Sequence, residues 1–75
     1  MENQQNKTLQ INNAIMLGKA AMTEGKHCIP WQDNDFIEML KLHQESVQGN
    51  ATFSEMFDAW INGWDNENLK SYKTE

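Results

Sequence analysis

Arginine, cysteine, proline and long apolar runs are all scarce in this sequence of 75 residues. It contains no arginine, and Cys28 and Pro30 are its only cysteine and proline. A single cysteine excludes an intrachain disulfide, which is typical of proteins in a reducing compartment. No apolar stretch approaches the roughly 18–20 residues that a membrane-spanning helix requires. Met1 to Lys7 lacks the basic and apolar regions of a signal peptide, so we expect a cytoplasmic protein without membrane contact.

The chain is also too short to build a large core. It has room for one domain, and a core of this size typically contributes about 3–5 kcal/mol of net stability. Domains of this size commonly gain further stability from disulfides, a metal or self-association. Because a disulfide is excluded and metal ligands are few, self-association is the favoured supplement. A homodimer or larger assembly is therefore expected as readily as a monomer.

The sequence does contain an excess of acid, with 11 Asp and Glu against six lysines and a formal charge of -5. Broad phosphate binding needs clustered Lys and Arg, and these lysines are scattered, so direct nucleic-acid binding is not expected. The simplest interpretation of the acidity is solubility. Alternatively, an acidic surface suits a basic protein partner, or a phage- or plasmid-encoded inhibitor that mimics nucleic acid against a host defence enzyme. The inhibitor hypothesis requires acids to gather on one face: Asp33, Asp35, Asp58, Asp65 and Glu67.

Apolar periodicity predicts an all-α, three-helix domain over residues 9–70, arranged as a hairpin or bundle between disordered tails at 1–8 and 71–75. The first helix is expected from about Leu9 to Glu24. Its inner face carries a strip of small residues, Ala14, Gly18, Ala21 and Gly25. Glycine inside a helix costs roughly 1 kcal/mol against alanine, so Gly18 predicts close approach of another helix or of an indole. Gly25 stands where a helix C-cap is expected.

A connector and a second helix follow. Pro30 disfavours helix at Ile29, which makes Lys26 to Gln32 a connector. Asp33 or Asn34 can cap the second helix. Gly49-Asn50 would end it, and its inner face would hold Phe36, Met39, Leu40, His43 and Val47.

The third helix has the clearest start. Thr52 and Glu55 fit a capping box, in which each side chain satisfies the other residue's backbone N–H. A broad apolar stripe follows, and the helix should fade near Asn66 to Lys70. The stripe consists of Phe53, Met56, Phe57, Trp60, Ile61 and Trp64, with Gly63 at its edge. We expect the tryptophan rings to pack onto the small-residue strip of the first helix.

No catalytic, cofactor or metal site is predicted, although three groups allow alternatives. His27, Cys28 and His43 could join an aspartate in a mixed metal site, but the paired ligand spacing of structural zinc is missing. The simpler interpretation makes Cys28 a small buried hydrophobe and His43 a core-edge histidine bonded to a carbonyl. Cys28 as nucleophile with His27 as base would need converging side chains, whereas neighbours in an extended connector point apart. Trp60 and Trp64 could form a stacking platform for bases, or simply belong to the core.

Apolar residues outside this core mark the expected partner-binding surface. Leu9, Met16 and Ala20 project opposite the inner arc of the first helix, and a contiguous patch there would indicate association. With two acids of the third helix, the predicted partner-binding set is Leu9, Met16, Leu17, Leu42, Asp58 and Asp65. The predicted structural set is Gly18, Gly25, Pro30, Phe57, Trp60, Gly63 and Trp64.

Three parts of the sequence together resemble ribosome modulation factor and its short relatives, over about half of the chain. They are the small residues leading to Gly18 and Gly25, then Cys28-Ile29-Pro30-Trp31, then Trp60-Ile61-Asn62-Gly63-Trp64. Trp60 to Asp65 is also similar to the W-x-x-G-W-D ending of small proteins of bacterial chromosomes, plasmids and phages.

The chain departs from that family in three ways. Ile29 separates Cys28 from Pro30, and a helix is inserted between Trp31 and Trp60. The ribosome-binding members are strongly basic, whereas this chain is acidic. The resemblance implies a helical fold and, through the family, a ribosome-linked role. We therefore expect a small, non-enzymatic bacterial or mobile-element regulator that acts through a helical protein-interaction surface.

Overall fold

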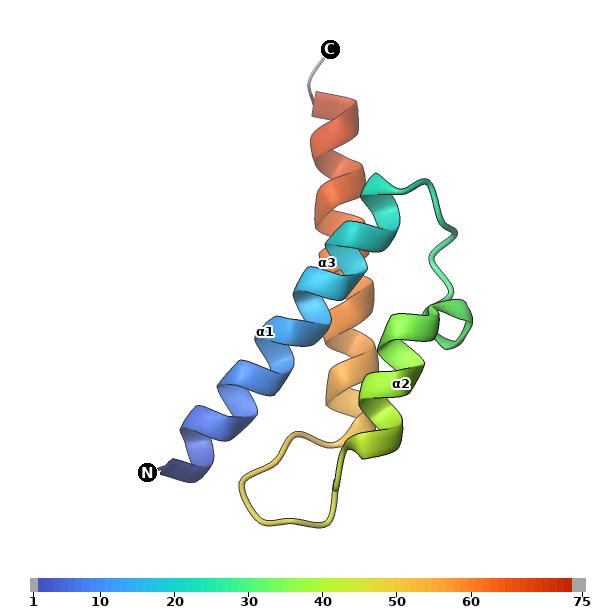
Figure 1. Ribbon diagram of the computed structural model, residues 1–75. Helices are drawn as coiled ribbons and strands as arrows, with labels where there is room; N and C mark the ends of the chain where they lie inside the picture. The colour runs from blue at the N-terminus through green and yellow to red at the C-terminus, as the bar shows by residue number, and fades with distance from the viewer. Residues whose placement is uncertain (1, 74–75) are drawn as a thin grey trace.

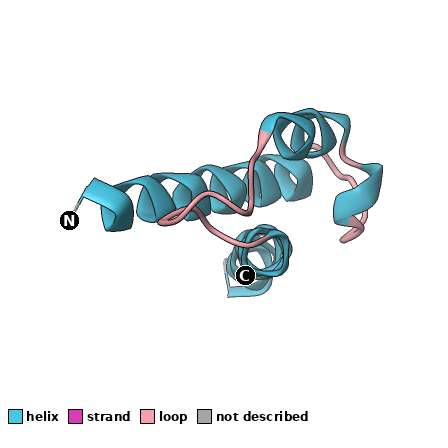
Figure 2. Cartoon of the chain, turned by 90° about the horizontal axis from the view of Figure 1, so that it is seen from below, coloured by secondary structure: helices cyan, strands magenta, loops and turns pink. Residues whose placement is uncertain are grey.

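The computed structural model describes the backbone of residues 2–73 and the side chains of residues 6–70. Its regular structure is three α-helices, α1 (Glu2–Thr23), α2 (Asn34–Leu42) and α3 (Phe53–Lys73), and a 3-10 helix, η1 (Pro30–Gln32). The described residues contain no strand, so the predicted all-α three-helix domain is confirmed. α1 and α3 run in the same direction and cross, while α2 returns beside them (Figure 1). Seen from below, α3 lies on one side of α1 and α2 (Figure 2).

Two glycines bring α1 and α3 together. A Cβ on Gly18 would overlap the carbonyl oxygen of Trp60 and lie 3.0 Å from the backbone nitrogen of Trp64. A Cβ on Gly63 would likewise overlap the carbonyl oxygen of Ile15. Each glycine thus faces the carbonyl three residues before the other glycine, which is a reciprocal backbone contact. The predicted close approach at Gly18 is confirmed, but its partner is the α3 backbone rather than an indole ring.

The core is small because much of it is alanine. Its buried hydrophobic residues are Ala14, Ala21, Phe36, Ala51, Met56, Ala59 and Trp60. Phe36 of α2 joins the helices, since its ring lies 5.3 Å from the ring of Phe57, edge to face, and 6.2 Å from that of Trp60. These ring contacts anchor α2 to α3, and Met39 and Leu40 of α2 also pack against the core.

α1 ends as its sequence predicts. Gly25 has a φ of 81°, its N–H donates to the carbonyl of Met22, and the N–H of Lys26 donates to the carbonyl of Ala21 at 2.9 Å. This pair of bonds is a Schellman motif, which satisfies carbonyls that the helix end leaves open. Gly25 therefore belongs to the cap and does not extend the small-residue strip.

The start of α3 is a capping box that also binds α1. Glu55 accepts the N–H of Thr52 at 2.9 Å, and the Thr52 hydroxyl accepts the N–H of Glu55 at 3.1 Å, as predicted. Lys7 of α1 pairs with Glu55 at 2.8 Å. That ammonium, and next the Thr52 N–H, hold the pKa of the Glu55 carboxyl below its usual value. The Gln10 amide donates to the side-chain oxygen of Asn50 at 3.0 Å.

Three predicted helix limits are wrong. α1 begins at Glu2 rather than Leu9, and α3 continues to Lys73, so both helices enter the segments assigned to tails. An existing helix extends at little cost even without apolar periodicity. Residues 1, 74 and 75 of those predicted tails lie outside the described residues.

α2 ends at Leu42 rather than at Gly49-Asn50, and Val47, which was expected on its inner face, is exposed outside the helix. The sequence that follows is polar, and such side chains compete with helical hydrogen bonds. Asn50, for example, donates its side-chain N–H to the carbonyl of Gln44 at 2.8 Å. His43 is drawn off the helix as well, because its ring bonds the carbonyl of Ala51.

Candidate protein-interaction surfaces

A buried carboxylate joins the connector, α2 and α3. One Asp33 oxygen caps α2 by accepting the N–H groups of Asp35 at 3.1 Å and Phe36 at 3.4 Å. The other accepts the indole N–H of Trp60 at 2.8 Å. Trp60 has no exposed surface and Asp33 is 4% exposed, so the bond lies in the core. Asp33 was predicted as a helix cap or as one of the acids of the inhibitor hypothesis, and no local pattern marks its bond to a residue 27 positions away.

Trp64 completes this junction from the next turn of α3. It is half-buried, and its indole N–H donates to the carbonyl of Lys26 at 2.9 Å, just beyond the end of α1. The indole N–H groups of Trp60 and Trp64 are therefore both hydrogen-bonded within the fold. The buried ring of Trp60 cannot serve as a stacking platform, so the core interpretation of this pair is confirmed for Trp60.

A hollow of about 230 Å³ opens above the junction. Its lining includes Lys26 and His27 at the connector and reaches Asp33 and Trp60 at its floor. Lys26 pairs with Glu24 at 3.2 Å, and hydrogen bonding to that carboxylate raises the pKa of Lys26. Asp33 already accepts three hydrogen bonds, so it has little capacity left for a ligand in this hollow.

The groups considered for chemistry are dispersed. Burial, and next the charge of Asp65, raise the pKa of the half-buried Cys28 thiol, which keeps it a poor nucleophile. His27 is exposed beside it. His43 lies at the core edge with Nε2 2.6 Å from the Ala51 carbonyl, as predicted, and a carbonyl only accepts, so this nitrogen carries the proton. In the described part of the chain, no three His, Cys, Asp or Glu side chains gather where a metal ion could bind.

An apolar groove of about 410 Å³ runs between α1 and α2. It is lined by Asn13, Met16, Leu17, Ala20 and Met39. Three of the apolar residues that the sequence analysis singled out on α1 thus share one hollow. Leu9, from the same predicted surface, is 61% exposed but does not line it.

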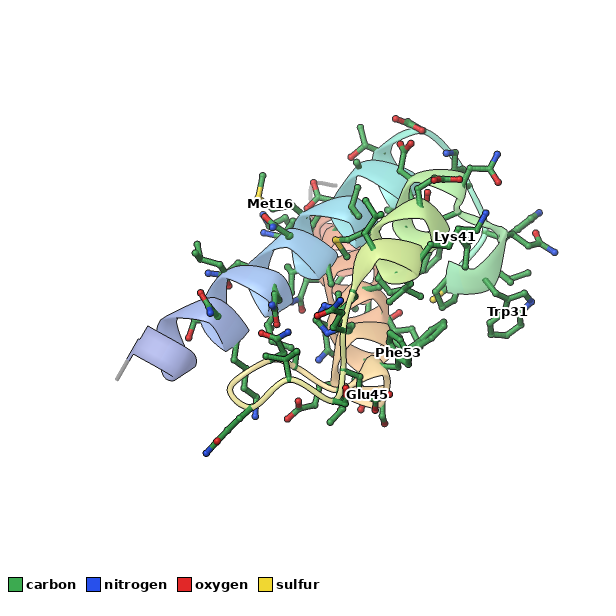
Figure 3. The ribbon with its side chains drawn as sticks, turned by 60° about the horizontal axis from the view of Figure 1, so that its bottom comes forward. Met16, Trp31, Lys41, Glu45 and Phe53 are labelled. Carbon is green, nitrogen blue, oxygen red and sulfur yellow. The ribbon has the colours of Figure 1, made fainter. Side chains whose placement is uncertain are left out.

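A second set of exposed and half-buried residues, which we call the α3 flank, includes three aromatic side chains. It comprises Trp31, Phe53, Phe57 and Ile61, bordered by Asp58 and Asp65. Phe53, Phe57 and Ile61 follow one another at four-residue spacing on α3, so they form a row. The Phe53 ring also lies 5.7 Å from the His43 ring. Trp31, on η1, is 66% exposed and projects on the side of the molecule away from Met16 (Figure 3).

Trp31 was not predicted as a site residue. Pro30 is buried at the start of η1, and successive residues of a 3-10 helix point about 120° apart, so burying Pro30 turns the next side chain outward. In the sequence Trp31 directly follows Pro30, so the two side chains point in different directions and only one of them can face the core. The sequence did not show which of the two residues that is, so the exposure of Trp31 could not be predicted.

The other predicted partner-binding residues are divided between surfaces. Leu42 is 85% exposed at the end of α2. Asp58 and Asp65 are exposed on α3, seven residues apart and so on one face of that helix. Leu9, Met16 and Leu17 belong to the α1 side. The structure therefore does not bring the predicted set of six into one patch.

The five acids of the inhibitor hypothesis do not form one exposed face either. Asp33 is buried and bonded, and Glu67 is half-buried beside Lys70 at 3.8 Å. Asp35, Asp58 and Asp65 remain exposed.

No helix within the described residues combines the length and apolarity needed to cross a membrane.

No protein-family model matches this chain, and neither the curated proteins nor the solved structures compared with it contain a match. The resemblance to ribosome modulation factor therefore stays a prediction. Five of the residues that carry it have structural roles here: Gly18 and Gly63 at the crossing, Gly25 in the cap, and Trp60 and Trp64 at the junction.

Proposed function

We propose that this protein is a small non-enzymatic regulator that binds a protein partner through the α3 flank. The observation that supports the proposal most directly is the 66% exposure of Trp31 on η1, together with the partly exposed row of Phe53, Phe57 and Ile61 on α3. Tryptophan is among the residues most enriched at the energetic centres of interfaces, and leaving it in water is costly for a free domain.

The charge of the flank indicates the kind of protein surface that would fit it. Asp58 and Asp65 border the apolar row, and the whole chain carries a charge of -5. A complementary surface would present apolar side chains surrounded by Lys and Arg. The raised pKa of Cys28 and the dispersed histidines support a binding role over catalysis.

The test is affinity capture from the native cell with the full chain and with Trp31→Ala. Because Trp31 is exposed, the variant should unfold at the same temperature as the wild type. Its affinity for the partner should fall at least tenfold, which corresponds to about 1.4 kcal/mol of binding free energy. Leu69→Ala is the matched control, since Leu69 is also an exposed apolar residue, at 54%, but lies near the end of α3. Equal capture by wild type and Trp31→Ala would contradict the proposal.

Salt and the identity of the partner separate the remaining alternatives. Capture of a nucleic-acid enzyme that is lost at high salt, and also lost in Asp58→Asn and Asp65→Asn, would favour the acidic inhibitor. Co-sedimentation with ribosomes, dependent on Trp31, would favour a ribosome-associated regulator. Binding that persists at high salt would place the affinity in the apolar row.

A further inference from the structure

α1 carries an uncharged seam on the side that faces away from α3. Its residues follow the alternating spacing of three and four that is typical of a coiled-coil seam: Asn6, Leu9, Asn13, Met16, Ala20 and Thr23. All six are exposed. The inner face of α1, by contrast, holds Ala14, Gly18 and Ala21 against α3 and the core. α1 therefore has two packing faces, and only one of them is covered within the described chain.

The second face is unusual for this protein because it lacks charge. The sequence contains 17 charged residues, yet over the span of the seam, residues 6–23, only Lys7 and Lys19 are charged, and Lys7 is paired with Glu55. Helix surfaces that face water normally carry charged residues of both signs. Depletion of charge together with exposed Met and Leu is the composition of an interface core.

The fold leaves room on this side for another helix. α3 lies on one side of α1 and α2, and the opposite side of those two helices carries no helix in the described residues (Figure 2). There the seam residues Asn13, Met16 and Ala20 form one wall of the 410 Å³ groove, and Met39 of α2 lines the other. The molecule is thin as well, with Cα extents of 43 × 24 × 14 Å.

We infer that this seam binds α1 of a second copy of the chain, forming a homodimer. Two chains that each carry a charge of -5 repel one another, so a shared interface must be free of charge. The seam meets that condition, and a symmetric interface needs a surface that fits itself. Large Leu9 and Met16 alternate with smaller Asn13 and Ala20 along it, so two seams can interdigitate. Asn13 at a seam position can bond its own kind and fix the number of helices.

The dimer leaves the α3 flank free, because Met16 and Trp31 project on opposite sides (Figure 3). The inference is thus independent of the proposed partner surface. If both hold, one assembly presents two copies of the flank, which raises avidity for a repeated or symmetric partner.

The test is the mass of the full chain by sedimentation equilibrium, from low micromolar to millimolar concentration. We expect the wild type to reach twice the chain mass. Met16→Lys should raise the dimer dissociation constant by about a hundredfold, because a buried uncompensated charge disfavours association by that order. Leu69→Lys makes a comparable change at an exposed apolar residue outside the seam and should leave the constant unchanged.

Ala20→Lys is a second seam variant with the same expected effect, and far-UV circular dichroism checks that each variant keeps its helices. A wild type that stays monomeric at millimolar concentration would overturn the inference. So would a folded Met16→Lys or Ala20→Lys variant with the wild-type dissociation constant. Failure here would leave the Trp31-dependent capture untouched, since that experiment depends on the other side of the molecule.

Discussion

At the scale of single residues, Asp33 links more of the structure than any other polar side chain described here. One carboxylate oxygen starts α2 and the other holds the buried indole of Trp60. Because the ring is fully buried, water cannot replace this acceptor if it is removed. The sequence showed Asp33 as one of two possible caps, whereas its second bond joins residues that only folding brings together.

Asp33→Ala should therefore destabilise the fold by about 2–4 kcal/mol, from the lost cap and the unpaired indole N–H. The measurement is urea unfolding followed by circular dichroism. Asn34→Ala, at an exposed neighbouring position, is the control and should stay within about 0.5 kcal/mol of the wild type.

A double-mutant cycle tests the bond itself. Trp60→Phe removes the donor, so Asp33→Ala should cost less in that background than in the wild type. Identical costs in both backgrounds would show that the indole bond contributes nothing to stability.

At the scale of elements, the α1–α3 crossing determines the shape of the domain. Gly18 and Gly63 let the two backbones meet, and each glycine stands against a carbonyl of the opposite helix. Side chains at the crossing would push the helices apart and loosen the rings of α3 from α2. This contact gives a physical reason for the spacing of Trp60, Gly63 and Trp64, since Gly63 lies between two indoles that are both bonded elsewhere.

Gly18→Ala and Gly63→Ala should each destabilise the protein, by about 1–3 kcal/mol, because the added methyl overlaps backbone that cannot move independently. The direction of the change in stability is informative, because replacing glycine with alanine inside an ordinary helix stabilises the protein by about 1 kcal/mol. Asn62→Ala, next to Gly63 but exposed, should show little change or a small gain. Thermal melting of the three variants decides the matter, and an unchanged or higher melting temperature for Gly63→Ala would refute the close crossing.

At the scale of the whole molecule, a thin acidic domain has two surfaces of opposite character. The α1 seam is uncharged, whereas the α3 flank places acids around aromatic residues. Salt should act on them in opposite directions, because it screens repulsion between like-charged copies and also attraction to a basic partner.

Raising the ionic strength from about 0.01 M to about 0.15 M shortens the Debye length from about 30 Å to about 8 Å. Over that range we expect the dimer dissociation constant to fall several-fold, while capture of a basic partner weakens. Sedimentation at both ionic strengths measures the first effect and quantitative affinity capture the second. A dimer that weakens as salt rises would place charged pairs, rather than an apolar seam, at its interface.

The features that the sequence alone determined are local ones. Gly25 forms its cap and Thr52 pairs with Glu55 across one helical turn, because both depend on residues within five positions of each other. The all-α class follows from periodicity in the same way. The apolar stripe of the third helix likewise placed Trp64 and, at its edge, Gly63, although it could not say what they contact.

Tertiary structure decided what depends on distant residues. Trp60 is buried by a bond to Asp33 at a separation of 27 positions, while Trp31 is left in water because Pro30 takes the inner position. α2 stops at Leu42 because His43 bonds Ala51 across the following loop. Which tryptophan is available for recognition, and which face of α1 stays open, are set by how the helices cross. Two glycines 45 positions apart in the sequence make that crossing possible.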